Sequence, residues 1–541
     1  MPGTMASQAM FTPGMKADFA YTLRMAAGKS SSRLYAMILR TEASHLALLV
    51  ACCLGCSQNA GSANATARRG ETAGELDAAQ GNVATGTDGG GGNGPTDGSS
   101  PITSADASGN QPSSPQDPCS IDALREPVAA TTYYVATGEP GADNVMCDGL
   151  APSNQGAGHC PFKDFSSPTT RGLLDGKKST RVEVRAGTYI VTGWDGLRVT
   201  GIGASDAERV VLSAYPGEHP VLEVGSPDGA GCDAATAMTT PACVREVIRI
   251  SGSYTVVQGL TIQNGLGYHV EVTGGAHHLF RCNTLHETVA FPMRSDCLKL
   301  DGGASDIEIL HNDFSRFRSQ AIDMTNVSDV LIEDNDIHDP IDADAGATGT
   351  KFGGRDITIR NNRIHDFGDD PKMHAFSLGG TGTMHPDDHE AYAVHIESNR
   401  VWNIVGKLAQ VVSCVDCSIE NNVLLSAGAG VIVSASATGQ PECGASANGC
   451  GPSTGLSIRG NRMRALDGGG DATQANVFIF VEAGEQTGLS ASKNLYCAPT
   501  PATARFGWLS ALLDFDAWVK ASGTDADSTT VASSDPQCTS F

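Results

Sequence analysis

Residues 332–337 read IEDNDI, and this short phrase decides the fold. Its pattern is an apolar residue, two further residues, asparagine, any residue and a second apolar residue. Eight copies occur, at residues 256–261 (VVQGLT, with Gly259 in place of asparagine), 279–285 (LFRCNTL), 309–314 (ILHNDF), 332–337, 359–364 (IRNNRI), 396–401 (IESNRV), 419–424 (IENNVL) and 458–463 (IRGNRM). Short alternating apolar runs flank each copy, which is the period of a β-strand and not of a helix.

The asparagines recur at a spacing that predicts a solenoid of strands. Asn312 and Asn335 are 23 residues apart, Asn335 and Asn362 are 27 apart, and Asn399 and Asn422 are again 23 apart. Self-similarity at this spacing is typical of solenoids, and a turn of this length holds three short strands. We therefore predict an all-β parallel β-helix. An antiparallel β-sandwich is the alternative, but it gives no reason for one phrase to repeat.

Asparagine at a fixed place in each turn has two physical explanations. Asparagine tolerates the left-handed backbone conformation of a sharp bend. Its amide can also bond the asparagine one turn away, at the strand spacing of about 4.8 Å, to form a ladder. The longer intervals predict loops inserted into a turn, and such loops often carry function.

Composition limits the compartment and the partners. The chain has 541 residues and a formal net charge of −24, which argues against a nucleic-acid or anionic-membrane partner. Its 16 cysteines indicate an oxidising compartment. Local disulfides are expected between Cys232 and Cys243, Cys443 and Cys450, and Cys497 and Cys538. For Cys414 and Cys417 a disulfide or two stacked core thiols is favoured over a zinc site, because no second pair at metal spacing accompanies them.

The N-terminus predicts export and a lipid anchor. Residues 46–54 (LALLVACCL) are too short to span a bilayer as a helix and fit the apolar part of a secretion signal. Cys52 and Cys56 each end a stretch that resembles a bacterial lipobox, and Met37 is an alternative start. We predict a signal at residues 1–56, a flexible tether rich in Gly, Ser, Asn and Asp at 57–118, and one folded domain at 119–541. An ordinary cleaved signal peptide is the alternative. The predicted location is the bacterial cell envelope or the outside of the cell, the only membrane contact is the lipid, and a monomer is expected.

Several further segments resemble a known family. Residues 132–138 (TYYVATG), 182–189 (VEVRAGTY), 214–221 (AYPGEHPV) and 515–536 are similar to segments of the right-handed parallel β-helix proteins of the pectate-lyase-like superfamily. The resemblance covers about residues 131–536. It implies a right-handed β-helix and a polysaccharide partner. It leaves the activity open, because this superfamily includes polysaccharide lyases, glycoside hydrolases, uronan epimerases and non-catalytic adhesins.

Counting back from each asparagine predicts one column of outward side chains on the preceding strand. In a parallel stack these residues lie one above another. The column is Arg249, Glu271, Lys299, Asp323, Lys351, Ser377 and Gln410. It lies on the face where, according to the resemblance, related lyases bind sugar.

A uronan lyase site is the functional interpretation of this column. β-Elimination needs a cation for the uronate carboxylate, a base and an acid. Lys351, Lys299 and Arg249 are the candidate catalytic residues, with Lys351 favoured. Glu271, Asp323, Ser377, Gln410, Arg355, His385 and His389 are the candidate substrate-binding residues. The resemblance implies that Ca²⁺ takes part, and the carboxylates that could hold it are Asp296, Asp301, Asp323, Asp342 and Asp344.

A structural interpretation of the same column stands beside the functional one. Alternating charges at sheet spacing attract each other without any substrate. A lysine beside Asp323 should have its pKa raised, which is the wrong direction for a base. Residues 379–392 (GGTGTMHPDDHEAY) pose the same choice, between a metal or sugar contact and an exposed acidic loop.

A second column follows the asparagines, and it carries aromatic rings. It contains His286, Ser315, His338, His365 and Trp402, and we interpret it as solvated stacking more than as catalysis. The leading hypothesis is therefore a surface lyase acting on an acidic glycan through the first column. The alternatives are another carbohydrate enzyme, namely a hydrolase or an epimerase, and a non-catalytic adhesin or glycan-binding solenoid.

Overall fold

The computed structural model describes residues 117–120, 124, 129–192, 196–224, 245–288, 295–342, 346–368, 370, 372–379, 389–426, 429–433, 452–465, 477–482, 486–509 and 511–539. The predicted signal, Cys52, Cys56 and the tether up to residue 116 lie outside these ranges. So do His385, Asp344, and the Cys232–Cys243 and Cys443–Cys450 pairs.

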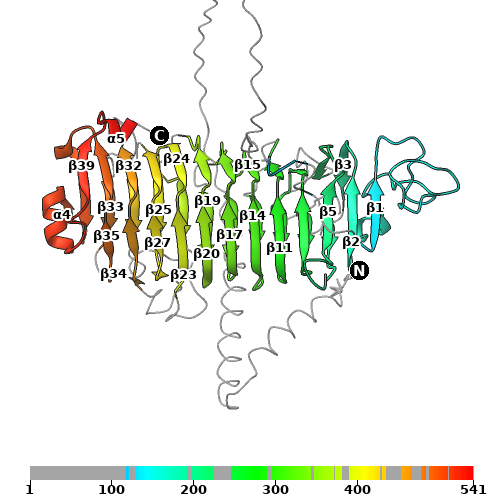
Figure 1. Ribbon diagram of the computed structural model, residues 1–541, viewed down its shortest axis with the longest axis horizontal. Coiled ribbons are helices and arrows are strands. Elements are labelled where there is room, and N and C mark those ends of the chain that lie inside the picture. The colour runs from blue at the N-terminus through cyan, green and yellow to red at the C-terminus, as the bar shows by residue number, and fades with distance from the viewer. Residues whose placement is uncertain are drawn as a thin grey trace, which may run out of the picture. The chain divides into compact units, whose positions relative to one another are not determined.

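Three long parallel sheets form the domain, and each turn of chain adds one strand to each sheet (Figure 1). Sheet A contains β1 (Thr131–Val135), β2 (Thr180–Val184), β5 (Val210–Ala214), β8 (Thr255–Gln258), β11 (Ala276–Arg281), β14 (Ser305–Leu310), β17 (Ser328–Glu333), β20 (Gly354–Arg360), β23 (Ala391–Glu397), β26 (Cys414–Val415), β27 (Ser418–Glu420), β30 (Ser453–Thr454), β31 (Ser457–Arg459), β34 (Gln486–Thr487) and β35 (Ser490–Ser492).

Sheet B follows sheet A in each turn. It contains β3 (Thr188–Val191), β6 (Val221–Val224), β9 (Thr261–Gln263), β12 (Thr284–His286), β15 (Asp313–Ser315), β18 (Asp336–His338), β21 (Arg363–His365), β24 (Arg400–Ile404), β28 (Val423–Ser426), β32 (Arg462–Ala465), β36 (Leu495–Ala498) and β39 (Thr529–Ala532).

Sheet C closes the turn. It contains β4 (Leu197–Val199), β7 (Glu246–Ile250), β10 (Tyr268–Val272), β13 (Asp296–Leu300), β16 (Gln320–Thr325), β19 (Gly346–Lys351), β22 (His374–Leu378), β25 (Lys407–Val411), β29 (Ala429–Val433), β33 (Val477–Val481), β37 (Arg505–Trp508) and β38 (Ala511–Leu513). Only β38 pairs antiparallel among the described strands. The predicted right-handed parallel β-helix is confirmed, and the antiparallel sandwich is excluded for the described sheets.

Columns of identical side chains fill the core. Six of the eight copies open with an isoleucine, which points inward from sheet A and is fully buried at Ile309, Ile332, Ile359, Ile396, Ile419 and Ile458. The apolar residue that closes the copy points inward from sheet B, as at Phe314 and Ile337. Full burial of one such side chain stabilises the fold by roughly 1.5–3 kcal/mol, so the phrase supplies the core as well as the bend.

The asparagines form the predicted ladder. The side-chain amide of Asn312 donates to Oδ1 of Asn335 over 3.0 Å, and Asn335 donates to Asn362 over the same distance. The ladder runs from Asn283 to Asn494 and so includes a member outside the eight copies. Each amide also donates to a backbone carbonyl, as Asn335 does to that of Ile309. The ladder therefore satisfies buried polar groups at every bend.

The prediction that the ladder asparagine takes the left-handed conformation is wrong. The residue before it has the positive φ instead: 55° at His311, 55° at Asp334 and 57° at Asn361. Gly259 (φ 70°) occupies this same position, so Leu260 and not Gly259 is the register partner of the ladder asparagine. The ladder residue keeps an ordinary backbone, because its amide must point into the bend.

A helix closes the C-terminal end of the stack. The helix α4 (Phe515–Ser522) begins at the N-cap Asp514 and ends at Gly523, which has φ 71°. Trp518 on α4 is fully buried, stacks on Phe506 of β37 at 5.6 Å and donates its indole N–H to Asp525 over 3.0 Å. The shorter helical segments are α3 (Pro168–Arg171), η1 (Pro501–Thr503) and α5 (Pro536–Thr539).

Disulfides secure the strand connections. The predicted Cys497–Cys538 bond is confirmed, and Cys414 and Cys417 form a disulfide rather than two free thiols. Two bonds were not foreseen, Cys147–Cys160 and Cys119–Cys282. The second of these pairs residues 163 apart in sequence.

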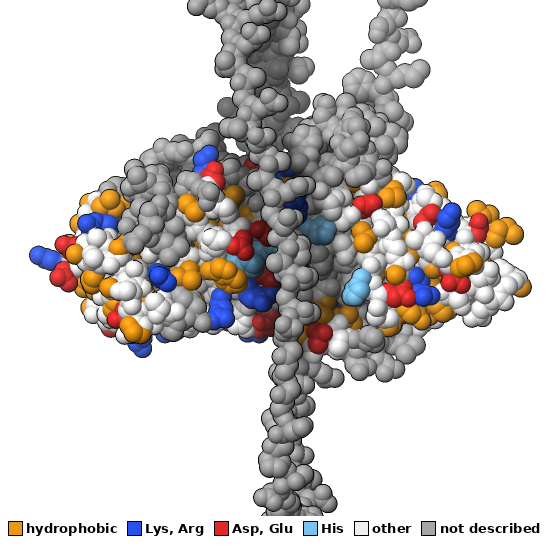
Figure 2. Space-filling model, turned by 90° about the horizontal axis from the view of Figure 1, so that it is seen from above, with side chains coloured by type: hydrophobic (Ala, Val, Ile, Leu, Met, Phe, Trp, Pro, Cys, Tyr) orange, Lys and Arg blue, Asp and Glu red, His pale blue; other side chains and the backbone are white. Residues whose placement is uncertain are grey.

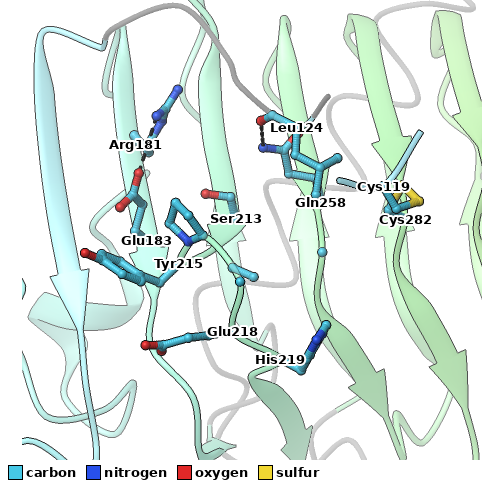
Figure 3. A pocket seen from close by; sticks show the side chains of 14 residues that line it. Cys119, Leu124, Arg181, Glu183, Ser213, Tyr215, Glu218, His219, Gln258 and Cys282 are labelled. Atoms are coloured by element: carbon cyan, nitrogen blue, oxygen red, sulfur yellow. Dashed lines mark hydrogen bonds and ion pairs between the residues drawn. A yellow bond between two sulfur atoms is a disulfide. The ribbon is translucent and has the colours of Figure 1, made fainter. Parts of the chain in front are cut away.

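The Cys119–Cys282 bond holds an N-terminal segment against sheet A beside a hollow of about 420 Å³ (Figure 3). Gln258 of β8 donates to the carbonyl of Leu124 over 2.8 Å at the edge of this hollow. Three charged residues that line it are paired within the domain: Glu218 contacts Arg185, and Arg181 contacts Glu183. We interpret this hollow as part of the attachment of the N-terminal segment.

Candidate functional site

The outer face of sheet C carries two rows of polar side chains. In each strand two successive residues point into the core, as Ala321 and Ile322 do. The residue before this pair and the residue after it, here Gln320 and Asp323, both point outward. We call these two rows the sheet C strip. One row is Glu246, Tyr268, Asp296, Gln320, Gly346, His374 and Lys407, and the other is Arg249, Glu271, Lys299, Asp323, Gly349, Ser377 and Gln410.

The register confirms most of the predicted column. Glu271 pairs with Arg249 on one side and with Lys299 on the other, and Lys299 pairs with Asp323. Ser377 pairs with Gln410 two strands further on. The other row was missed, because strict alternation does not allow for two consecutive inward residues.

The predicted place of Lys351 is wrong by two residues. Gly349 pairs with Asp323 and Ser377, whereas Lys351 pairs with Thr325 at the end of the strand. The column position in this turn is a glycine, Gly349, and Lys351 is the next charged residue along the strand. The Lys351 side chain nevertheless reaches the column, because its Nζ lies 3.0 Å from Oδ1 of Asp323.

Two lysines hold the Asp323 carboxylate. Lys299 contacts Oδ2 of Asp323 and also donates to the hydroxyl of Thr325 over 2.7 Å, while Lys351 contacts Oδ1. Lys299 and Asp323 are only 8% and 4% exposed. Both ammonium groups therefore face one carboxylate, and together the three side chains form a compact charged cluster on the strip.

Lys407 is in the opposite situation. It lies in the row that sequence reasoning missed, where it is the register partner of His374 and donates to the side-chain carbonyl of Gln410 over 3.1 Å. Burial lowers its pKa, against a smaller opposing effect of Glu482. A lowered pKa makes the neutral amine, which is the basic form of lysine, easier to reach at Lys407.

A carboxyl pair occupies the other end of the strip. Burial and the adjacent Glu271 raise the pKa of Glu246 to about 8. Arg249 contacts Glu246 at 3.2 Å and Glu271 at 3.8 Å, and Arg245 contacts Glu271 at 3.2 Å. The raised pKa of Glu246 favours its protonated form at neutral pH.

The carboxylates proposed for calcium are only partly brought together. Burial, followed by the charge of Asp323, raises the pKa of Asp296 to about 6, and Asp296 accepts from the backbone of Gln320 over 2.9 Å. Asp301 follows β13, and burial and Glu271 raise its pKa. Asp342 lies between β18 and β19. Among the described residues no three acidic, histidine or cysteine side chains form a metal cluster, and Asp323 is engaged by lysines. Calcium binding stays a prediction.

Two predicted substrate contacts lie elsewhere. Arg355 is on β20 of sheet A, where its guanidinium lies 5.6 Å from the ring centre of Tyr392. His389 contacts Tyr392 as well and bonds the carbonyl of Pro452 over 3.0 Å. These residues do not belong to the sheet C strip, because the strand after Lys351 turns into sheet A. Ser377 stays in the strip and donates to the carbonyl of Gly379 over 2.8 Å.

The second predicted column is an aromatic stack on sheet B. His338 and His365 are parallel at 5.1 Å, and His365 stacks on Trp402 at 4.3 Å. Asp313 and, less strongly, Asp339 raise the pKa of His338 to about 9, against the effect of burial. Figure 2 shows histidine, acidic and basic side chains gathered near the middle of the face seen from above. The predicted stacking is confirmed.

A family model described as right handed beta helix region matches residues 246–378 and 302–464. The chain contains a right-handed β-helix region. The comparison with curated proteins found no match. No helix among the described residues has both the length and the apolar character needed to cross a membrane.

Solved β-helix structures are similar to the chain at low identity. A pectate lyase is 13% identical over 68% of this chain and 80% of that chain, with a TM-score of 0.37. An alginate lyase from Paenibacillus sp. is 11% identical over 59% and 94%, with a TM-score of 0.37. PfbA, a surface adhesin of Streptococcus pneumoniae, is 12% identical over 64% and 88%, with a TM-score of 0.35.

Proposed function

We propose that the protein is a polysaccharide lyase that binds a uronic-acid glycan along the sheet C strip and cleaves it by β-elimination. One observation carries this proposal: the strip presents two lysines that can hold an acidic group and one lysine that can act as the base. Lys299 and Lys351 are held beside a carboxylate, whereas Lys407 is hydrogen-bonded to a neutral amide. The four Lys and Arg side chains around Glu271 and Asp323 also offer an acidic glycan local cations on an acidic chain.

In this mechanism the neutral amine of Lys407 removes the proton next to the uronate carboxylate. The side-chain NH2 of Gln410, in the neighbouring row, donates to that carboxylate as charge moves onto it. The ammonium groups of Lys299 and Lys351 hold the carboxylate of another sugar unit along the strip. His374, the register partner of Lys407, lies where it can return a proton to the leaving oxygen.

The arrangement is less suited to hydrolysis. A glycosidase places two carboxyl groups about 5–9.5 Å apart across one bond. Arg249 contacts both Glu246 and Glu271, so the two carboxyl groups share one cation on the strip and do not face each other across an open space. Glycan binding without cleavage is the second candidate. It is favoured by the burial of Lys299 and Asp323, since charges that already satisfy each other form a stable ladder.

The test is incubation with polygalacturonate, alginate and glycosaminoglycans while the absorbance of the unsaturated product is followed, with and without EDTA. Lys407→Met should lower kcat by about 10²-fold or more, whereas Lys351→Met should mainly raise KM. Lys520→Met, on the distant helix α4, is the matched control. Binding without any unsaturated product would support the glycan-binding candidate, and a fully active Lys407→Met would exclude this residue as the base.

A further inference from the structure

A second polar surface lies on sheet B, away from the sheet C strip. The outward residues of β24 are Arg400 and Trp402, and those of the next strand, β28, are the short apolar Val423 and Leu425. Beyond these, the outward residues of β32 are Arg462 and Arg464. One rung of small apolar side chains is therefore enclosed between two rungs that carry arginine.

This arrangement leaves a hollow of about 310 Å³ in the face of the sheet. Its lining residues are Arg363, Arg400, Val401, Trp402, Val423 and Leu425. Trp402 stacks on His365 of the preceding rung at an interplanar angle of 12°. The opposite side of the indole faces the rung of Leu425, so an aromatic wall and an aliphatic floor meet in the hollow.

The arginines around the hollow differ in how they are paired. Arg363 contacts Asp336 on the N-terminal side. The guanidinium group of Arg400 forms no hydrogen bond or ion pair with another described residue. Nε of Arg464 is buried and has no hydrogen-bond partner. On sheet A, by contrast, Arg360 is held by Glu333 and Arg459 by Glu420.

An unpartnered arginine is notable in a chain with a net charge of −24. In such a chain, carboxylates are available to pair with most cations, as they do on sheet A. In Figure 2, basic side chains lie among hydrophobic ones on the left of the face, toward the C-terminal rungs. An incoming anion would therefore meet donors here that no described carboxylate already occupies.

We propose that this hollow binds a carboxylated sugar unit, with Arg400 as the anion contact in the hollow, Arg464 on the adjoining rung as a second donor at its edge, and Trp402 and Leu425 as the apolar surface. Guanidinium groups bind carboxylates through two parallel hydrogen bonds. The C–H face of a pyranose packs on aromatic and aliphatic side chains, as ligands do in sites that combine apolar walls with a few polar groups. The inference extends the proposed substrate class to a separate binding surface, which would hold a long chain while the strip acts on another part of it.

The test measures binding by calorimetry with oligogalacturonate, a neutral xylo-oligosaccharide and polyglutamate, using the full chain. The background is Lys407→Met, so that no turnover occurs. Arg400→Gln with Arg464→Gln should weaken one class of oligogalacturonate site by about tenfold or more. Trp402→Ala should weaken the same class. Arg459→Gln, a paired arginine on sheet A, is the matched control, and circular dichroism checks folding.

The outcomes separate this inference from the proposed function. If Lys299→Met with Lys351→Met abolishes one class of site and the Arg400-dependent class remains, the sheet B site exists even if no lyase activity is found. Unchanged oligogalacturonate binding in the folded Arg400→Gln, Arg464→Gln variant would overturn it. Equal affinity for polyglutamate would also overturn it, since the hollow would then recognise charge without the sugar.

Discussion

The ammonium group of Lys351 lies 3.0 Å from Oδ1 of Asp323, although the backbones of the two residues are not register partners. Lys299 contacts the other oxygen of the same carboxylate. Asp323 thus joins three neighbouring strands through its side chain, and the loss of either lysine leaves it one partner.

Asp323→Ala should destabilise the fold more than Lys351→Ala. Removal of the carboxylate leaves Lys299 buried without its counter-charge, and breaking a buried ion pair from one side costs about 3–5 kcal/mol. In Lys351→Ala the contact between Lys299 and Asp323 persists, so the loss should be about 1 kcal/mol. Urea unfolding followed by circular dichroism measures both values. Equal losses would show that the two lysines do not depend on Asp323.

Asn335→Ala should lower the free energy of unfolding by about 2–4 kcal/mol. The substitution removes a buried acceptor of the Asn312 amide and a donor to the Ile309 carbonyl, and each buried group left unsatisfied costs about 1–3 kcal/mol. Glu308→Ala, at an exposed position of β14, is the comparison. A loss below about 1 kcal/mol for Asn335→Ala would mean that water replaces the ladder contacts.

Stability should fall as the pH rises from about 4.5 to 8, through the carboxyl pair on the strip. The folded-state pKa of Glu246 is about 8, above the usual value of an unfolded glutamate, so the folded state binds the extra proton. The stabilising effect is complete below the unfolded pKa and is lost as the pH rises through the folded one. Glu246→Gln should flatten this part of the profile, whereas Glu208→Gln, an exposed control, should not. Unfolding by urea at several pH values decides between these outcomes.

The His338 ring should remain protonated to about pH 9. Asp313 and Asp339 favour its cationic form, so its folded pKa is raised. Any stability that it contributes is present below its unfolded pKa and is lost as the pH rises through about 9. Asp313→Asn should move the NMR titration midpoint of His338 downward. An unchanged midpoint in this variant would assign the shift to another group.

The rate of cleavage should increase with pH over a range that lies below the ordinary pKa of lysine. Burial lowers the pKa of Lys407, and only its neutral form can remove a proton. The profile of kcat/KM for a cleaved polyuronate should therefore rise through the lowered pKa of Lys407. Gln410→Ala, which removes its hydrogen-bond partner, should shift that limb. If the limb stays in place in Gln410→Ala and in Lys407→Arg, the titrating group is another residue.

The fold was predictable because one phrase combines the core and the bend. Ile332, Asn335 and Ile337 each serve a separate purpose, and their repetition at turn length leaves few alternatives. The column was predictable from Glu271 to Asp323, because the count back from the asparagine stays at 12 or 13 residues in those turns. It failed at Gly349, since a glycine offers no side chain by which to recognise the position.

The row that contains Glu246 and Lys407 could not be recognised by alternation. Its strands place two consecutive apolar residues inward, such as Leu408 and Ala409, and this shifts the next outward residue by one. The signal was nevertheless present, because a polar residue three positions before each column member recurs at Asp296, Gln320 and His374. The pairing of Arg355 with Tyr392 depended on where one sheet ends and the next begins, which the sequence does not mark.

The burial of Trp518 of α4 against the last strands determines how the stack of strands ends. A stack of identical rungs has no intrinsic length, because the exposed backbone of its final strand can accept another strand from any source. The α4 helix covers the apolar interior at that end and so makes the stack finite. A chain cut before Phe515 would keep every rung that precedes it, and it would be expected to grow end to end into filaments.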